Sequence, residues 1–208
     1  MEGMVPDQEN GRQEQVVTVR PEKKAAPAEP LCDILLAMML ITMIPMMFGM
    51  VSGVGTIAYV PCVLMAYPVV IVGVVFMFKD GDVINATVNG VLTSSFLGQN
   101  AISGIIYLVY SVNEVEMPAE VQSGLAMFTG MSFLVAGIFV LALSVMTIKV
   151  DKVFGVLLVI AGVGFLCYAG MNLGLGTAIG TVGSVCFVIF AVYMLYRGIS
   201  MLFPPKEA

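Results

Sequence analysis

The sequence predicts an all-α integral membrane protein with six transmembrane helices and with its N-terminus and C-terminus in the cytoplasm. Of the 208 residues, 59% are hydrophobic and only 11% are charged, whereas soluble domains are roughly a quarter charged. The apolar residues gather in six long segments, and the basic residues fall at alternate breaks between those segments. This distribution excludes a water-soluble domain and fixes an orientation in the membrane.

Residues 1–30 are predicted to be a disordered cytoplasmic tail, because they are polar and carry charges of both signs. Residues 31–203 are predicted to form a six-helix transmembrane transporter or channel domain, and residues 204–208 a short cytoplasmic tail. A helix needs about 20 residues to cross a bilayer, while a membrane strand needs only about 10, so the segments are helical. They are 31–52, 54–78, 83–111, 121–148, 153–172 and 177–200.

Each segment ends at a break of distinct chemistry. In chain order these are a small-residue turn at 51–55, a charged turn at 79–82, an acidic loop at 113–120, a charged turn at 149–152 and an uncharged flexible turn at 172–177. With a cytoplasmic N-terminus, all 9 Lys and Arg residues lie on the cytoplasmic side. The opposite side carries Glu114, Glu116 and Glu120 instead. The positive-inside rule therefore favours six spans in a cell membrane, either a bacterial inner membrane or a plasma membrane.

The third segment is unusually polar for a helix that faces lipid. Asn85, Asn89 and Thr93 follow one another at steps of four residues, and Asn100 continues their stripe. Such groups are costly in hydrocarbon unless they face water or protein, so we expect them to line a permeation pathway. The alternative is that they join helices by hydrogen bonds. We also expect Asn172, at the outer end of the fifth segment, to line this pathway. The alternative is that Asn172 caps its helix.

The absence of charged residues inside the segments limits the kinds of solute that can cross. No charged residue occurs from position 34 to 78, and we expect no buried Arg or Lys to hold an anion. The solute should then be small and neutral as it crosses, or a small anion held by amide and hydroxyl dipoles. A protonated short carboxylic acid, urea or another short amide, and ammonia all fit.

Other classes of function find no support in the sequence. The 4 cysteines form no C-x-x-C pair and histidine is absent, so no metal site or cofactor is expected. No catalytic motif is recognisable, which predicts that the protein is not an enzyme and has no catalytic residues. No basic patch offers a surface to nucleic acid.

Three stretches resemble the acetate uptake transporters, also called succinate-acetate permeases. They are Phe78–Thr87 at the start of the third segment, Met146–Lys149 with Lys152–Phe154, and Ala169–Gly174. The resemblance covers about residues 30–203. It implies a six-helix protomer around a pore, assembled as a homo-oligomer, a hexamer in that family, which passes acetate or a related short monocarboxylate with a proton or as the neutral acid.

The sequence also departs from that family. The family's signature Asn-Pro-Ala-Pro-Leu-Gly-Leu is reduced here to Glu29-Pro30-Leu31-Cys32. The aromatic residues that narrow the family's pore are replaced by Leu36 and Leu92, which we expect to contribute a constriction. A urea, short-amide or ammonia channel and a non-transporting membrane scaffold subunit are the alternative functions.

Overall fold

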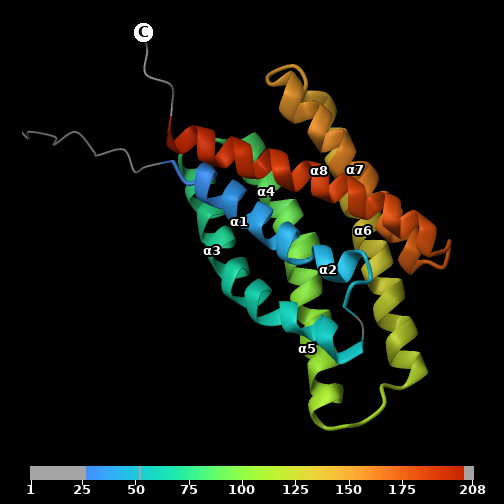
Figure 1. Ribbon diagram of the computed structural model, residues 1–208. Helices are drawn as coiled ribbons and strands as arrows, with labels where there is room; N and C mark the ends of the chain where they lie inside the picture. Colours follow the sequence, from blue (N-terminus) through green and yellow to red (C-terminus); the bar gives the residue numbers. More distant parts are fainter. Residues whose placement is uncertain (1–26, 52, 204–208) are drawn as a thin grey trace, which may run out of the picture.

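The computed structural model describes residues 27–51 and 53–203, and within these ranges every regular element is helical (Figure 1). Residues 1–26 and 204–208, where most of the predicted tails fall, lie outside the described residues. In chain order the elements are α1 (Glu29–Thr42), α2 (Ile44–Met47), η1 (Gly53–Tyr59), α3 (Val60–Lys79), α4 (Val83–Leu92), η2 (Thr93–Gly98), α5 (Gln99–Val112), α6 (Ala119–Thr147), α7 (Lys152–Asn172) and α8 (Thr177–Leu202).

These elements form six helical columns, one for each apolar segment of the sequence. The columns are α1 with α2, η1 with α3, α4 with η2 and α5, and then α6, α7 and α8. Each column packs against the next along the chain, and α8 returns to pack against α1. The columns therefore close into a ring, with α8 beside α1 in Figure 1.

Four helices of the described chain are long and apolar enough to cross a membrane: Ile57–Lys79, Ala119–Thr147, Lys152–Asn172 and Thr177–Leu202. The first and third columns are interrupted instead. Pro45 lies in the first turn of α2, just after the break that ends α1, and proline removes a backbone donor from a helix. In the third column a π-helical segment, η2, separates α4 from α5. Such π segments are rare and often mark functional sites.

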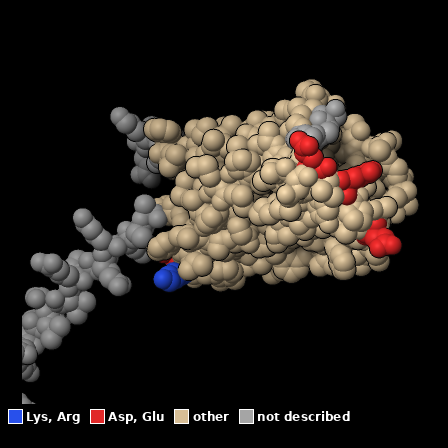
Figure 2. All heavy atoms as spheres, turned by 90° about the horizontal axis from the view of Figure 1, so that it is seen from below, with Lys and Arg blue, Asp and Glu red and all other residues tan. Residues whose placement is uncertain are grey.

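The two ends of the ring differ in charge, and we name them after one residue each. The Glu114 end holds the loop between α5 and α6, with Glu114, Glu116 and Glu120. The Arg197 end is where α1, α4 and α7 begin and where α3, α6 and α8 end. On the face shown in Figure 2, acidic and basic atoms appear only at the two opposite ends. The wide surface between them has the uncharged character of a surface that contacts lipid.

Outward-facing side chains on the long helices are mainly apolar. Met65 on α3 and Phe128 on α6 are 77% and 74% exposed. Inside the bundle, α7 and α8 approach closely at Gly164 and Gly183, where a Cβ on Gly183 would lie 3.0 Å from the Gly164 carbonyl oxygen. Small residues at helix interfaces are typical of membrane bundles. The chain is therefore a helical membrane protein with a tightly packed interior.

Candidate functional site

The interior of the ring holds a cavity near the Glu114 end, which we call the polar cavity because its mainly apolar lining also includes two asparagines, a threonine and a tyrosine. Its volume is about 160 Å³. The predicted pathway residues Asn100 and Asn172 both line it. Each amide is held by its own helix, because Asn100 Nδ2 donates to the Phe96 carbonyl at 2.6 Å and Asn172 Nδ2 donates to the Tyr168 carbonyl at 2.8 Å. The other lining residues are Met43, Met46, Met47, Phe96, Thr129, Phe133, Tyr168 and Met171.

Next to this cavity, on its side toward the Arg197 end, four phenylalanine rings meet inside the bundle. One comes from each of η2, α6, α7 and α8, and all four are buried: Phe96, Phe133, Phe165 and Phe187. The ring centroids of Phe96 and Phe187 are 5.1 Å apart, and those of Phe165 and Phe187 are 5.0 Å apart. Edge-to-face contacts between aromatic rings at these distances are energetically favourable and hold the rings in place. The four rings therefore form a plug that separates the polar cavity from the rest of the axis.

The sequence-predicted constriction residues lie at this plug. Leu36 and Leu92 are 1% and 3% exposed. Together with Leu40, Phe96, Phe165, Phe187 and Phe190, they line a cavity of only about 10 Å³. That is at the lower limit for holding one water molecule, so the axis is closed here in this conformation. The structure thus brings Leu36 and Leu92 together, and adds aromatic rings to which the sequence alone does not point.

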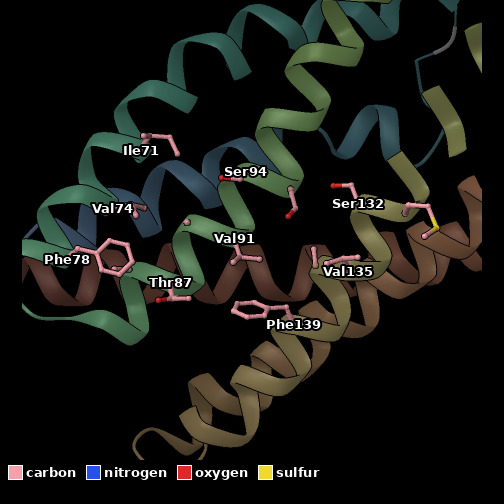
Figure 3. Close-up of a pocket in the computed structure, with 14 residues that line it drawn as sticks. Ile71, Val74, Phe78, Thr87, Val91, Ser94, Ser132, Val135 and Phe139 are labelled. Atoms are coloured by element: carbon pink, nitrogen blue, oxygen red, sulfur yellow. The ribbon is translucent and has the colours of Figure 1, made fainter. Parts of the chain in front are cut away.

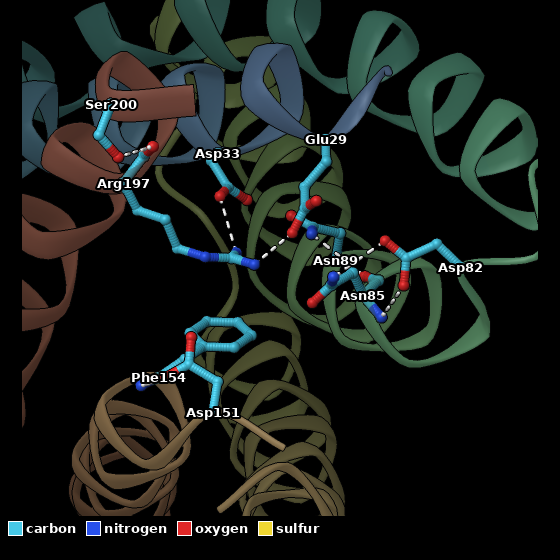
Figure 4. A network of polar contacts seen from close by, with 9 residues as sticks. All are labelled: Glu29, Asp33, Asp82, Asn85, Asn89, Asp151, Phe154, Arg197 and Ser200. Atoms are coloured by element: carbon cyan, nitrogen blue, oxygen red, sulfur yellow. Dashed lines mark hydrogen bonds and ion pairs between the residues drawn. The ribbon is translucent and has the colours of Figure 1, made fainter. Parts of the chain in front are cut away.

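A cluster of charged and polar side chains lies on the other side of the plug, toward the Arg197 end (Figure 4). Arg197 Nη1 donates to Asp33 Oδ2 at 2.8 Å, and Arg197 Nη2 donates to Glu29 Oε1. The guanidinium group also stacks on Phe154, with its carbon 4.1 Å from the ring centroid. Three helices, α1, α7 and α8, therefore meet at Arg197.

Arg197 comes close to the buried base that the sequence interpretation does not expect. It lies within the predicted sixth segment and within α8, and its side chain is partly buried, at 11% exposed. Asp33 is fully buried, at 0%. The sequence did contain a signal: a lone base in a long apolar helix needs a counter-charge, and Asp33 is an acid in another apolar helix. Glu29, one turn before Asp33, falls within the predicted tail 1–30 but is the first residue of α1.

The predicted polar stripe of the third column divides between several environments. Asn89 and Thr93 are fully buried. Asn89 lies beside the charged cluster (Figure 4), where its Nδ2 donates to the Asn85 carbonyl at 3.1 Å, and Thr93 follows one turn later at the start of η2. Asn85 lies in the first turn of α4, where its Nδ2 donates at 2.9 Å to Oδ2 of Asp82, the residue that caps the helix. Asn100 lies beyond the phenylalanine plug, in the polar cavity. The five predicted pathway residues therefore occupy both sides of the plug rather than one unbroken track.

Other polar residues of the same column face outward. Thr87, Ser94 and Ser95 line a groove of about 830 Å³ between α3, the third column and α6 (Figure 3). Apolar side chains such as Phe78 and Phe139 form most of its wall, and none of its lining residues is charged. This groove lies at the outside of the ring, so the axis and not the groove is the candidate route for a solute.

Comparison with known proteins identifies a similar fold. No protein-family model matches the chain, and no curated protein matches it either. A solved structure, "Structure of the bacterial acetate channel SatP", superposes with a TM-score of 0.68 at 18% sequence identity. The match covers 86% of this chain and 92% of that chain. The likeness confirms the all-helical fold that the resemblance to the acetate uptake transporters implies, and the protein in that solved structure is a channel rather than an enzyme.

Proposed function

We propose that this protein is a membrane channel or secondary transporter of the acetate uptake transporter family, which carries acetate or a related short monocarboxylate. One observation carries the proposal. A polar cavity, a phenylalanine plug and a charged cluster follow one another along the axis of a six-column ring. The likeness of this ring to a solved acetate channel supports the choice of solute.

The plug sets the form in which the solute crosses. The narrow cavity is lined by leucine and phenylalanine side chains alone. Moving an ionised carboxylate out of water into such surroundings is very costly, whereas the neutral acid loses far less hydration. The solute therefore passes the plug as the neutral acid, or together with a proton.

The six columns are proposed to be six membrane spans, with the Arg197 end in the cytoplasm. Lys79, Lys149, Lys152 and Arg197 all lie at that end. The positive-inside rule supports this orientation, which places both termini inside and makes the protein a multi-pass protein of the cell membrane. The two interrupted columns are spans of the kind tolerated where irregular backbone lines a cavity.

The protein is proposed to assemble as a homo-oligomer, and as a hexamer on the family resemblance. The outer groove with Thr87, Ser94 and Ser95 supports a contact between copies, because hydroxyl groups on an apolar face can hydrogen-bond to a neighbouring helix. Native mass spectrometry of the detergent-purified protein tests this proposal. A monomer under conditions that preserve the fold would contradict it.

A urea, short-amide or ammonia channel is the second candidate. The amide and hydroxyl groups of the polar cavity, including Asn100, Thr129 and Asn172, are also suited to a neutral amide. The phenylalanine plug and the fold of the solved relative favour the carboxylate.

Reconstitution into liposomes tests the proposed function. Purified protein is incorporated into vesicles, and uptake of labelled acetate, urea and methylammonium is measured under the same gradient. We expect acetate uptake to exceed that of empty vesicles, and urea and methylammonium uptake to equal it. Uptake of urea without acetate would make the second candidate correct, and no uptake of any solute would indicate a scaffold subunit.

A further inference from the structure

The charged cluster contains polar atoms that lack a partner. Among the described residues, three buried side-chain atoms have no hydrogen-bond partner: Asp33 Oδ1, Asn89 Oδ1 and Thr93 Oγ1. All three residues are 0% exposed. Such atoms are costly, and native structures leave few of them. Asp33 belongs to the ion pair, Asn89 lies beside it (Figure 4), and Thr93 lies one turn after Asn89 on the same column, toward the plug. This succession points to a ligand that supplies the missing partners.

The charge of the cluster is also incomplete. Glu29 and Asp33 contribute two negative charges, and Arg197 contributes one positive charge, so the ionised cluster carries one net negative charge. Asn89 is neutral, and α3 brings no charged residue to this region before Lys79 at its last position. A buried net charge is unfavourable, and one added proton removes it.

The cluster directly continues the solute route. On α1, Asp33 lies three residues before Leu36, and on α4, Asn89 lies three residues before Leu92. Both leucines line the narrow cavity at the plug. On α8, Arg197 lies seven residues after a phenylalanine of that cavity. Spacings of three and seven keep residues on one face of a helix. The cavity residues at these three positions are Leu36, Leu92 and Phe190.

We infer that Asp33 and Arg197 form a coupling site, at which Asp33 takes a proton and thereby releases Arg197 to bind the carboxylate of the solute. The inference rests on the proposed carboxylate transport and deepens it. While Asp33 is ionised, its Oδ2 occupies Arg197 Nη1. Once Asp33 is neutral this ion pair weakens, and Arg197 Nη1 can donate to the carboxylate of the solute while Nη2 stays on Glu29.

The transfer balances without a further reactant. A neutral acid leaves the plug and meets Thr93 and then Asn89, whose unpaired oxygens can accept from its hydroxyl group. Its O–H bond breaks, and the proton forms a new O–H bond at the unpaired Asp33 Oδ1. The resulting carboxylate binds Arg197, and both carboxylate and proton then leave to the water at the Arg197 end.

Several groups surround Asp33 and influence the charge of the site. Glu29 and Cys32 lie on α1, and Arg197 and Tyr193 lie on α8. Asp82, before α4, acts on Glu29, and Asp151, before α7, acts on Tyr193. Arg197 is thus the only base among these groups, which makes its release the step that controls anion binding.

Acetate binding as a function of pH tests the inference. The dissociation constant is measured by calorimetry on the full chain in nanodiscs, at pH values where acetate itself is ionised. In the wild type, over the pH range in which Asp33 is ionised in the free protein, the dissociation constant should rise about tenfold for each pH unit, because one proton is then taken up with each acetate. In Asp33→Asn it should be independent of pH and, at the highest pH, at least about tenfold lower than in the wild type. Asp80→Asn, in the exposed turn after α3, is the matched control and should behave as the wild type.

A second variant covers the case in which Asp33→Asn fails to fold. Thr93→Val removes a hydroxyl group that has no protein partner, so its stability should equal or exceed that of the wild type. If the hydroxyl group contacts the solute, acetate binding should weaken about tenfold. An unchanged dissociation constant in Thr93→Val would contradict the inference.

The remaining outcomes separate this inference from the proposed function. If the wild type takes up acetate and Asp33→Asn keeps the wild-type pH dependence, the coupling site is overturned and the transport function stands. If Glu29→Gln alone removes the pH dependence, the proton belongs to Glu29 and the assignment to Asp33 is overturned. If the wild type neither binds nor takes up acetate, the proposed function itself is wrong.

Discussion

Arg197 on α8 donates a hydrogen bond to Asp33 on α1 at 2.8 Å, and so joins the last helix of the chain to the first. The two residues are 164 positions apart in the sequence. Because α1 and α8 are neighbours in the ring, this ion pair closes the bundle at the end where Glu29 and Phe154 also meet Arg197. The same residues thus stabilise the fold and face the solute route.

Replacing Arg197 with methionine should strongly destabilise the protein. The change leaves two carboxylates, Glu29 and Asp33, together in a poorly hydrated place, and breaking a buried pair in this way costs about 3–5 kcal/mol. Thermal unfolding followed by circular dichroism in detergent measures the effect. Lys152→Met, at an exposed position at the same end, is the control and should stay within about 0.5 kcal/mol of the wild type.

A compensated variant checks the cause of that loss. Adding Glu29→Gln and Asp33→Asn to Arg197→Met removes all charge from the cluster, so most of the lost stability should return. If the triple variant is as unstable as Arg197→Met, packing of the arginine stem on Phe154 and not charge explains the effect.

Phe133→Leu should widen the plug and relax selectivity. Phe133 is 2% exposed and stacks on Phe96 with ring centroids 6.0 Å apart. Uptake of butyrate relative to acetate in proteoliposomes should rise about tenfold, the change expected for roughly 1.4 kcal/mol of relieved crowding. Phe128→Leu on the same helix, where Phe128 is 74% exposed, is the matched control. Equal ratios in both variants would show that the plug does not select the solute.

Asn89→Leu should slow acetate flux while leaving expression and assembly intact. The unpaired Oδ1 of Asn89 is available to a solute, and the loss of one such hydrogen bond corresponds to about a tenfold slower rate. Asn113→Leu is the control, because Asn113 Nδ2 makes the same kind of bond to its own helix, at 2.7 Å, on the exposed end of α5. Normal flux in Asn89→Leu, or a protein that does not fold, would make Asn89 a structural residue.

Accessibility of introduced cysteines tests the proposed orientation. In a background without native cysteines, Glu116→Cys should react with an impermeant maleimide on intact cells, and Asp80→Cys only after the cells are opened. The two positions lie in loops at opposite ends of the ring. The reverse pattern would place the Arg197 end outside and contradict the positive-inside assignment.

Much of the fold can be predicted from the sequence, because the length of each apolar segment and the positions of the charged residues between segments can be read without knowing the tertiary structure. Each of the six predicted segments becomes one column of the ring, and the charged turn at 79–82 separates α3 from α4 as expected. The π-helical interruption at Thr93–Gly98 was not predicted. A sequence reports helical periodicity, but a shift in the hydrogen-bond pattern inside a helix is decided by packing against its neighbours.

The candidate site was predictable only in part. The amide groups Asn89, Asn100 and Asn172 stood out because polar residues are rare at membrane depth. The plug residues did not, since Phe165 and Phe187 resemble any other apolar residue of a membrane helix until the helices are assembled. Arg197 was assigned to the cytoplasmic end, because the partner that allows its burial lies in a distant helix.

Acetate uptake by the reconstituted wild-type protein is the most direct test of the central claim. With an inward acetate gradient and an acidic external solution, the account predicts saturable uptake well above that of empty vesicles, and inhibition by other short monocarboxylates. Uptake equal to that of empty vesicles at every pH gradient would contradict it.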